Sequence, residues 1–352
     1  MDKSPILSII IPVYNSERTI SQTLDSLTNN QYDIEILCIN DGSTDGTESV
    51  IKKKMQHDNR IKLIIQLNGG ASRARNAGIA KVDAEYIMFC DADDEYGSNV
   101  FDCIIDDIKL YDPDYIVFGR RTLFEDGTSY SWLRNKTLCS DIEYNWYEYF
   151  NNTIQKRRHS TVVYNRVYRT RIIQQFNVMF DESLKLSEDL YFNFEYLKHA
   201  KNMIEDGRAE YIQHKVANSM TTTKRTDFFE EDTKVLGVIH RQYRESVVQF
   251  QPFLNRHMLC SAVLAVDRAL IRRDAHSANE AMKIIRGLLR NDDLRNAYCN
   301  YIECVDRTTK RKLRLLFNRQ ILAYWLVFIF RPRMKTLLLR YRLASQLKKQ
   351  IY

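Results

Sequence analysis

The chain has 352 residues, of which 44% are hydrophobic and 28% are charged. This ordinary globular composition excludes disordered and fibrous proteins, and the length is enough for about two domains. The seven cysteines form no Cys-x-x-Cys pair, a pattern typical of reduced thiols in a cytosolic protein and not of a disulfide framework or a zinc site.

The net charge of +7 is distributed unevenly along the chain. Residues 307–352 hold thirteen Lys or Arg and no Asp or Glu, which leaves 39 basic and 45 acidic side chains in residues 1–306. This basic tail contains the uncharged run 321–330, which is too short to span a bilayer, since a spanning helix needs about 20 residues. The run is long enough to lie in the headgroup region of an anionic membrane, with Tyr324 and Trp325 at the interface. Its apolar content favours a membrane surface over nucleic acid, and the alternative is a core helix with a solvated basic face.

Short apolar runs alternate with helical patterns through residues 1–224, which predicts an α/β domain with a mostly parallel sheet flanked by helices. The first run contains Pro12 and is followed by no cleavage site, so it is interpreted as a strand and not as a signal peptide. The runs are nearly continuous, as expected for strands covered on both faces. The expected strands are 7–13, 34–39, 61–65, 86–90 and 115–118, and the expected helices lie near 20–27, 45–56, 72–82 and 98–111.

Long helical patterns with little β signal begin at about residue 225. They predict a helical, basic C-terminal region over 225–352. Its last part, about 307–352, is the segment that we expect to associate with a membrane.

Four of the expected strands end in polar motifs, and ligands of open α/β sheets bind beyond the carboxyl ends of the strands. Asp41 can accept the imide N–H of uracil, thymine or guanine, which cytosine lacks, or it can simply open the turn before the next helix. Tyr14 offers an aromatic face for a base, although such a residue often only packs. No Gly-x-Gly-x-x-Gly or P-loop motif is present, which argues against NAD and P-loop chemistry. The motifs are Pro12-Val13-Tyr14-Asn15, Asn40-Asp41-Gly42-Ser43-Thr44-Asp45-Gly46, Asn68-Gly69-Gly70 with Arg75 beyond it, and Asp91-Ala92-Asp93-Asp94.

The acidic motif Asp91-Ala92-Asp93-Asp94 follows an apolar run directly. Three carboxylates within four residues repel one another, and a cation would relieve this repulsion. Oxygen ligands in small number suit Mg²⁺ or Mn²⁺, which completes its shell with diphosphate oxygens and water. The alternative is an acidic, solvated loop.

Together the four motifs resemble the family 2 inverting glycosyltransferases of GT-A fold, in the family's order and spacing over about the first 100 residues. The resemblance implies a Rossmann-like GT-A domain and a UDP-sugar donor. It also implies that Asp93 is the main metal ligand and that Asp91 lies near both ribose and metal. The residues implied at the UDP-sugar are Pro12, Tyr14, Asn15, Asp41, Asn68, Arg75, Asp91 and Ala92.

The segment 187–192 (SEDLYF) is similar to the Glu-Asp element that precedes an acceptor-side helix in bacterial members of this family. By that resemblance Asp189, with Glu188 beside it, is the catalytic general base. A sugar hydroxyl is a poor nucleophile at neutral pH, so a neighbouring carboxylate must take its proton during attack. The same residues also predict a helix start, with Ser187 as the cap and the two acids favoured by the helix dipole.

The segment 211–222 resembles the end of the family's catalytic domain. His214 falls where many relatives have a basic residue, and there it can contact diphosphate or metal. A purely structural histidine is the alternative.

Our first hypothesis is therefore a metal-dependent inverting glycosyltransferase of bacterial capsule, exopolysaccharide or O-antigen synthesis. It would act on a glycan or lipid-linked acceptor and lie peripherally on the cytoplasmic face of the cell membrane. A sugar-phosphate nucleotidyltransferase is a second hypothesis, but segment 14–17 lacks the Gly-rich phosphate loop of that class. A non-catalytic, membrane-bound scaffold is a third, and the intact Asp91, Asp93 and Asp189 speak against it.

Overall fold

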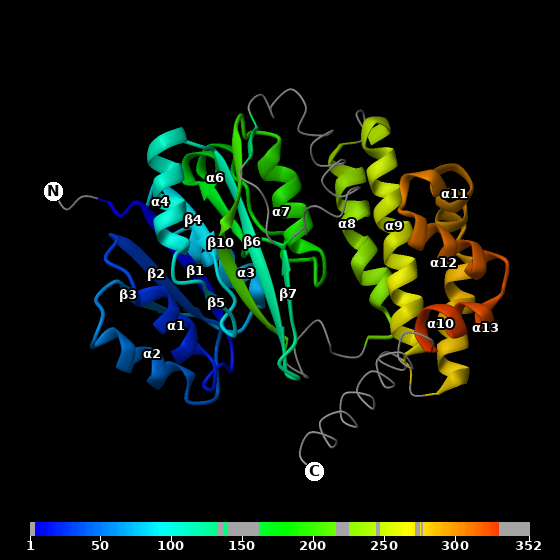
Figure 1. Ribbon diagram of the computed structural model, residues 1–352, viewed down its shortest axis with the longest axis horizontal. Helices are drawn as coiled ribbons and strands as arrows, with labels where there is room; N and C mark the ends of the chain where they lie inside the picture. Colours follow the sequence, from blue (N-terminus) through cyan, green and yellow to red (C-terminus); the bar gives the residue numbers. More distant parts are fainter. Residues whose placement is uncertain are drawn as a thin grey trace, which may run out of the picture. The chain divides into compact units, whose positions relative to one another are not determined.

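The structure is a computed structural model, and it describes residues 4–132, 137–139, 162–215, 225–243, 247–271, 275 and 277–330. The chain divides into two compact units, Met1–Ala217 and Asn218–Tyr352 (Figure 1). The first unit is a β-sheet flanked by helices, and the second consists of helices in its described part.

The strands of the first unit form one sheet of order β3-β2-β1-β4-β9-β6-β10-β5, with β7 paired to β6 and β8 paired to β10. Strands β3, β2, β1 and β4 are parallel, as are β6 and β10, whereas β9 is antiparallel to both of its neighbours β4 and β6. The carboxyl ends of the parallel strands therefore meet at one edge of the sheet, and the predicted α/β architecture is confirmed. The strands are β1 (Leu7–Val13), β2 (Ile34–Asn40), β3 (Ile61–Ile65), β4 (Tyr86–Phe89), β5 (Glu95–Tyr96), β6 (Tyr115–Phe124), β7 (Ser129–Trp132), β8 (Thr137–Cys139), β9 (Arg166–Arg169) and β10 (Met203–Lys215).

The five strands expected from the sequence are present as β1, β2, β3, β4 and β6. The expectation that all five strands are covered on both faces is wrong for β3. This strand lies at the edge of the sheet, and its Ile65 is 55% exposed. The remaining strands are short or polar, as in the Arg-Val-Tyr-Arg sequence of β9, and their local sequence carries no strong apolar run. They form because neighbouring strands complete their hydrogen bonds.

Helices pack onto this sheet where the apolar spacing predicts them. The face of α1 formed by Ile20, Leu24 and Leu27 is fully buried. Gly78 lets α3 approach β1 closely, since a Cβ at this position would lie 2.5 Å from Cγ2 of Ile10. The helices of the first unit are α1 (Ile20–Thr28), α2 (Thr47–Met55), α3 (Ala71–Ile79), α4 (Val100–Tyr111), α6 (Thr170–Phe176) and α7 (Glu188–Leu197).

The second unit is built around the long helix α9, against which α8, α10, α11 and α12 pack. The described part confirms the predicted helical C-terminal region. Its elements are α8 (Phe228–Gln242), α9 (Val247–Leu270), α10 (Ala278–Arg290), α11 (Asp292–Tyr301), η1 (Ile302–Cys304), α12 (Arg307–Phe317), α13 (Ile321–Tyr324) and η2 (Trp325–Phe330).

The first part of the basic tail folds back onto this helical unit. Tyr324 is 0% exposed, and its hydroxyl donates a hydrogen bond of 2.8 Å to Asp267 on α9. The expectation that Tyr324 lies at a membrane interface is therefore wrong, because this side chain belongs to the core. Residues 331–352 and the side chain of Trp325 lie outside the described residues. Among the helices that the structure describes, none is both long enough and apolar enough to cross a bilayer.

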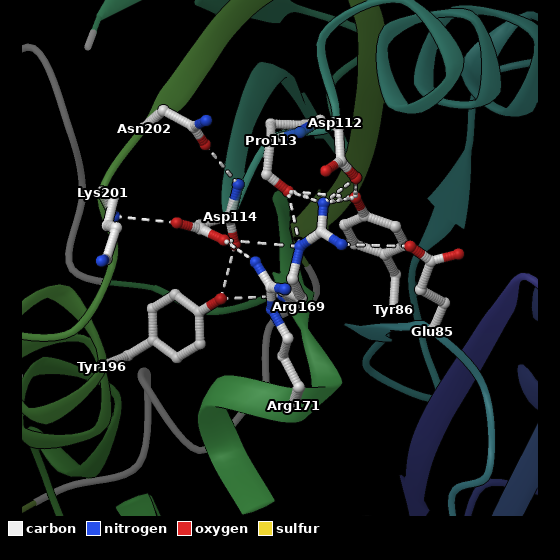
Figure 2. A network of polar contacts seen from close by, with 10 residues as sticks. All are labelled: Glu85, Tyr86, Asp112, Pro113, Asp114, Arg169, Arg171, Tyr196, Lys201 and Asn202. Atoms are coloured by element: carbon white, nitrogen blue, oxygen red, sulfur yellow. Dashed lines mark hydrogen bonds and ion pairs between the residues drawn. The ribbon is translucent and has the colours of Figure 1, made fainter. Parts of the chain in front are cut away.

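A polar network around Arg169 joins the amino-terminal ends of β4 and β6 to the end of β9 (Figure 2). The guanidinium of Arg169 lies 3.1 Å from Glu85 Oε1 and 3.4 Å from Asp114 Oδ1. It also pairs with Asp112 and donates to the carbonyl of Pro113. Asp114 in turn accepts the backbone N–H of Lys201 at 2.9 Å. One buried cation thus ties together the loops at the edge of the sheet opposite to the polar motifs.

Replacing Arg169 with Met is expected to lower the free energy of unfolding by about 3 kcal/mol, because it removes a buried cation and leaves the buried Asp114 paired only with the mostly exposed Arg171. Urea denaturation measures this change. The matched control is Arg171→Met, which removes a mostly exposed side chain 3.3 Å from the same Asp114 and is expected to cost less than about 1 kcal/mol. Equal losses for the two variants would contradict the assigned role of Arg169.

Candidate active site

The polar motifs that follow β1 and β2 are linked to each other at the carboxyl edge of the sheet. Asn15 adopts a left-handed backbone with φ 47°, and its side-chain oxygen accepts the N–H of Thr44 at 2.9 Å. Its own N–H donates to Ser43 Oγ at 3.0 Å. The ring of Tyr14 is 51% exposed beside this link. An aromatic face therefore lies open to solvent at the edge where ligands of such sheets bind.

Asp41 organises the loop that follows β3. Its buried carboxylate accepts hydrogen bonds from Gln66 Nε2 at 2.7 Å, Gly69 N at 2.9 Å and Gly70 N at 2.7 Å. Gly70 has φ 88°, a backbone conformation that favours glycine. A carboxylate offers about four acceptor positions, so one remains for a ligand such as an imide N–H.

Asn68 completes this loop, because its side-chain amide donates to the carbonyl of Asp41 at 2.9 Å. A Cβ at Gly42 would lie 3.0 Å from Asn68 N, so a larger residue there would press on the loop. The side chain of Pro12 is half-buried at the end of β1, and Ala92 is buried after β4. The predicted nucleotide residues other than Arg75 therefore lie at or just after the ends of neighbouring strands. Arg75 instead lies within helix α3, where it is buried.

The three carboxylates of the 91–94 turn have different surroundings. The side chain of Asp91 is 34% exposed, whereas Asp94 is buried and accepts hydrogen bonds from Tyr211 OH at 2.7 Å and His214 N at 2.8 Å. Burial, together with the charges of Asp91 and Asp93, raises the pKa of the Asp94 carboxyl to about 8. Burial and the charge of Asp91 also raise the pKa of Asp93. The alternative of a freely solvated acidic loop is thus wrong for Asp94.

The donor atoms of this turn fit a divalent cation held by few protein oxygens. The charge of Asp91 adds to burial in raising the pKa of Asp93, and a cation between the two carboxylates would relieve their repulsion. The ring of His214 instead lies 2.5 Å from Glu95 Oε1, through its Nε2. Within the described residues, no group of three or more His, Cys, Asp or Glu side chains is arranged to hold a metal. A cation held by Asp91 and Asp93 would complete its shell with water or with substrate oxygens.

Arg75 joins the acidic turn to the start of α7. Its guanidinium lies 3.2 Å from Asp91 Oδ1, 3.3 Å from Glu188 Oε1 and 3.4 Å from Asp189 Oδ1. Burial alone would lower the pKa of Arg75, but the three carboxylates raise it above its ordinary value, so the group stays charged. Two motifs about 100 residues apart in sequence are brought together by this one cation. The contact with uridine that the resemblance implies for Arg75 stays a prediction.

The carboxylate of Asp189 is largely buried beside the positive charge of Arg75. Burial raises the pKa of its carboxyl, Arg75 lowers it, and the charges of Glu188 and Asp91 raise it again, with a net value of about 7. Its other oxygen accepts the N–H of Val163 at 3.2 Å. The predicted helix start at residue 188 is confirmed, but the predicted cap is wrong, because Ser187 has φ 62° and makes no side-chain capping bond.

Sequence reasoning did not assign roles to Asn76 and Phe180, which help to place the start of α7. The amide of Asn76 donates to the carbonyl of Phe180 at 2.9 Å and accepts the N–H of Phe180 at 2.9 Å. The ring of Phe180 stacks on Phe192 of α7 at 4.2 Å, and the Arg75 guanidinium lies 5.2 Å from its centroid. Asn76 stands next to Arg75 in sequence, but its partner 104 residues away carries no local signal.

Comparisons with known proteins agree with this geometry. Residues 8–176 match the model of glycosyl transferase family 2. The chain is 28% identical over 308 residues to the uncharacterized glycosyltransferase EpsJ of Bacillus subtilis, an alignment that covers 83% of this chain and 86% of the relative. It is 42% identical over 97 residues to a poly(ribitol-phosphate) beta-glucosyltransferase of Bacillus spizizenii, covering 26% of this chain and 15% of the relative. The crystal structure of Staphylococcus aureus TarS 1-349 with UDP-GlcNAc superposes with a TM-score of 0.65 at 19% identity, covering 90% of this chain and 89% of that chain.

The fold and the site define a glycosyltransferase of GT-A fold. Residues 8–176 form a glycosyl transferase family 2 domain, and the protein is a glycosyltransferase. This assignment excludes the nucleotidyltransferase alternative.

Replacing Arg75 with Gln is expected to raise the pKa of Asp189 from about 7 by at least about one pH unit, because the variant loses the cation that favours the ionised carboxylate. The ¹³C chemical shift of the Asp189 carboxyl, followed over a pH titration, measures this pKa. The control is Arg73→Gln on the exposed face of the same helix, which is expected to leave the value unchanged. An unchanged or lower pKa in Arg75→Gln would overturn the assignment of Arg75 as its counter-charge.

Proposed function

We propose that this enzyme transfers a sugar from a UDP-sugar to a hydroxyl of a glycan acceptor, with inversion at the anomeric carbon and with Mn²⁺ or Mg²⁺ as cofactor. The observation that carries this proposal is the position of Arg75 within 3.4 Å of both Asp91 and Asp189. A single displacement needs the leaving diphosphate and the attacking hydroxyl on either side of one carbon. A donor-side and an acceptor-side carboxylate joined through one guanidinium suit that requirement.

The strand edge supports uridine as the base. Tyr14 offers an exposed ring for stacking, and Asp41 keeps one acceptor position for the imide N–H. Asn15 and Asn68 lie in the adjoining loops, and Pro12 lies near the end of β1. TarS, which has the same fold, was crystallised with UDP-GlcNAc, and this supports a UDP-sugar here.

Asp91 and Asp93 are the side chains that would hold the metal beside the donor diphosphate, with Ala92 between them. When bound, the metal would stabilise the negative charge that develops on UDP as it leaves. His214 is a third candidate, and its ring would have to leave Glu95 to reach the metal.

In the proposed reaction the acceptor oxygen attacks C1 of the sugar as the bond from C1 to the diphosphate oxygen breaks. The bonding electron pair leaves with UDP, and the proton of the hydroxyl passes to Asp189. A pKa of about 7 makes Asp189 a base matched to neutral pH, and Arg75, which lies 3.3 Å from Glu188 Oε1 and 3.4 Å from Asp189 Oδ1, holds the two side chains together. Because attack occurs opposite to the leaving group, the anomeric configuration inverts.

The relatives support cell-surface polysaccharide synthesis as the biological setting. They include a poly(ribitol-phosphate) beta-glucosyltransferase and a teichoic acid poly(glycerol phosphate) polymerase of Staphylococcus epidermidis. We therefore favour a lipid-linked glycan as acceptor, in the synthesis of a capsule or a related surface polymer. Such acceptors would require the enzyme to lie peripherally on the cytoplasmic face of the membrane.

A panel of UDP-sugars with Mn²⁺, Mg²⁺ or EDTA tests the donor and metal assignments. One donor is expected to bind and to be hydrolysed slowly with metal, and Asp93→Asn is expected to abolish metal-dependent binding. Asp189→Asn is expected to keep donor binding and to lower turnover at least about 100-fold, as the loss of a general base does. Calorimetry measures binding, and released UDP measures turnover. Absence of binding by every donor would reject the proposal of a UDP-sugar donor.

The basic tail supports membrane contact through one face of α12. Arg307, Arg311 and Arg314 are exposed at spacings of four and three residues, while Leu313 and Leu316 on the other face are buried. Leu322 and Leu326 follow with exposures of 71% and 43%. Exposed arginines beside exposed leucines suit the headgroups and the upper acyl region of an anionic bilayer.

Changing Arg307, Arg311 and Arg314 together to Gln is expected to weaken binding to phosphatidylglycerol-containing liposomes about 100-fold at low salt, since each basic residue near such a surface contributes about 1 kcal/mol. Liposome co-sedimentation measures this change. The matched control changes Lys283, Arg286 and Arg290, an exposed basic stripe on α10, and is expected to bind nearly as the wild type does. Equal weakening by both triple variants would show that only overall charge matters.

A further inference from the structure

We infer that Tyr211 is a positioning residue for the donor-side turn 91–94, acting through the carboxylate of Asp94 and the backbone of Asp91. This inference rests on the proposed function, because it concerns how the chain prepares Asp91 and Asp93 for a metal and a diphosphate. By this inference Asp94 anchors the turn to β10, and Asp91 and Asp93 alone are the candidate metal ligands in the turn.

One hydroxyl group holds both ends of the acidic turn. Tyr211 OH donates to Asp94 Oδ2 at 2.7 Å and accepts the backbone N–H of Asp91 at 3.2 Å. The other oxygen of Asp94 accepts the backbone N–H of His214 at 2.8 Å. The turn is therefore fastened to two points of the strand β10, which lies more than 100 residues later in the sequence.

Two neighbouring aromatic rings hold the ring of Tyr211, and this fixes the position of its hydroxyl group. Tyr211 is fully buried and stacks on Tyr164 with ring centroids 4.3 Å apart. Tyr96 meets the same ring edge-on at 5.2 Å. Arg120 Nη1 donates to Tyr164 OH at 2.7 Å, which holds the second ring of the stack in turn.

This anchor counteracts the repulsion within the turn. Asp91 and Asp93 repel each other, and a free loop would relax by moving them apart. A small divalent cation demands nearly ideal octahedral geometry, and it tolerates little displacement of its few protein ligands. By turning Asp94 inward, Tyr211 removes one carboxylate from the repelling group and holds the other two for the cation.

The test compares two tyrosine variants that lose the same atom from the same buried cluster. Tyr211→Phe is expected to weaken binding of UDP with Mn²⁺ about tenfold, as the loss of a buried hydrogen bond does. Tyr96→Phe is the control, because Tyr96 OH donates to the carbonyls of Phe89 at 2.8 Å and Tyr164 at 3.0 Å, outside the turn. Calorimetry measures the affinity, and thermal denaturation in EDTA checks that both variants fold.

A second readout needs no metal or nucleotide. Hydrogen exchange of the Asp91 amide in EDTA is expected to be at least about tenfold faster in Tyr211→Phe than in wild type or in Tyr96→Phe, because the amide loses its acceptor. If the wild type fails to bind UDP, the proposed function is rejected, while this exchange rate still tests the anchor. Wild-type affinity for UDP and Mn²⁺ in Tyr211→Phe, or equal weakening in both variants, would overturn the inference.

Asp94→Asn separates an anchor from a ligand. The amide keeps an acceptor for His214 N and a polar partner for Tyr211 OH, so UDP binding with Mn²⁺ is expected to weaken less than about fivefold. In Asp93→Asn the same binding is expected to be lost. Loss of binding in Asp94→Asn at an unchanged melting temperature would make Asp94 a ligand and would overturn its role as anchor.

Discussion

The candidate active site depends on one buried guanidinium that three carboxylates share. Arg75 comes from α3, Asp91 follows β4, and Glu188 and Asp189 begin α7, so the ion cluster joins three elements that have no local reason to meet. Removing the arginine would leave three partly buried carboxylates facing one another without a cation, which costs stability. The same cluster adjusts Asp189 to a pKa of about 7, so that one interaction serves both the fold and the proposed chemistry.

The sheet places this cluster through the directions of its strands. Parallel strands β1, β2, β3 and β4 bring four polar loops to one edge, and antiparallel β9 lies between β4 and β6, beyond which β10 extends the sheet. At the opposite edge, Arg169 forms ion pairs with the carboxylates of Asp112 and Asp114. Each edge of the sheet is therefore stabilised by a buried arginine that pairs with several carboxylates. Only one of them lies at the carboxyl ends of the parallel strands, where ligands bind.

The last strand of the first unit has a greater part in the site than its own sequence suggests. Strand β10 supplies Tyr211 and the backbone of His214, and both hold the acidic turn through Asp94. Nothing in the local sequence distinguishes Tyr211 from an ordinary core tyrosine. Its role follows only from the partner that it meets across the sheet. The inward position of Asp94 could not be predicted either, because three adjacent acids look alike until burial separates them.

The sequence by itself determined the positions of the first strands along the chain, the polar motifs at their ends and the resemblance to the family. Periodicity and loop chemistry are local properties that can be read along the chain. It also located the helix start at residue 188, though not how that helix is capped. The tertiary structure decided where Arg75 points, which carboxylate of the turn is buried, and that Tyr324 packs against Asp267 instead of facing a membrane. These features depend on contacts between residues far apart in the chain. The free energy of burying and pairing a charge is set by those partners and not by neighbours in sequence.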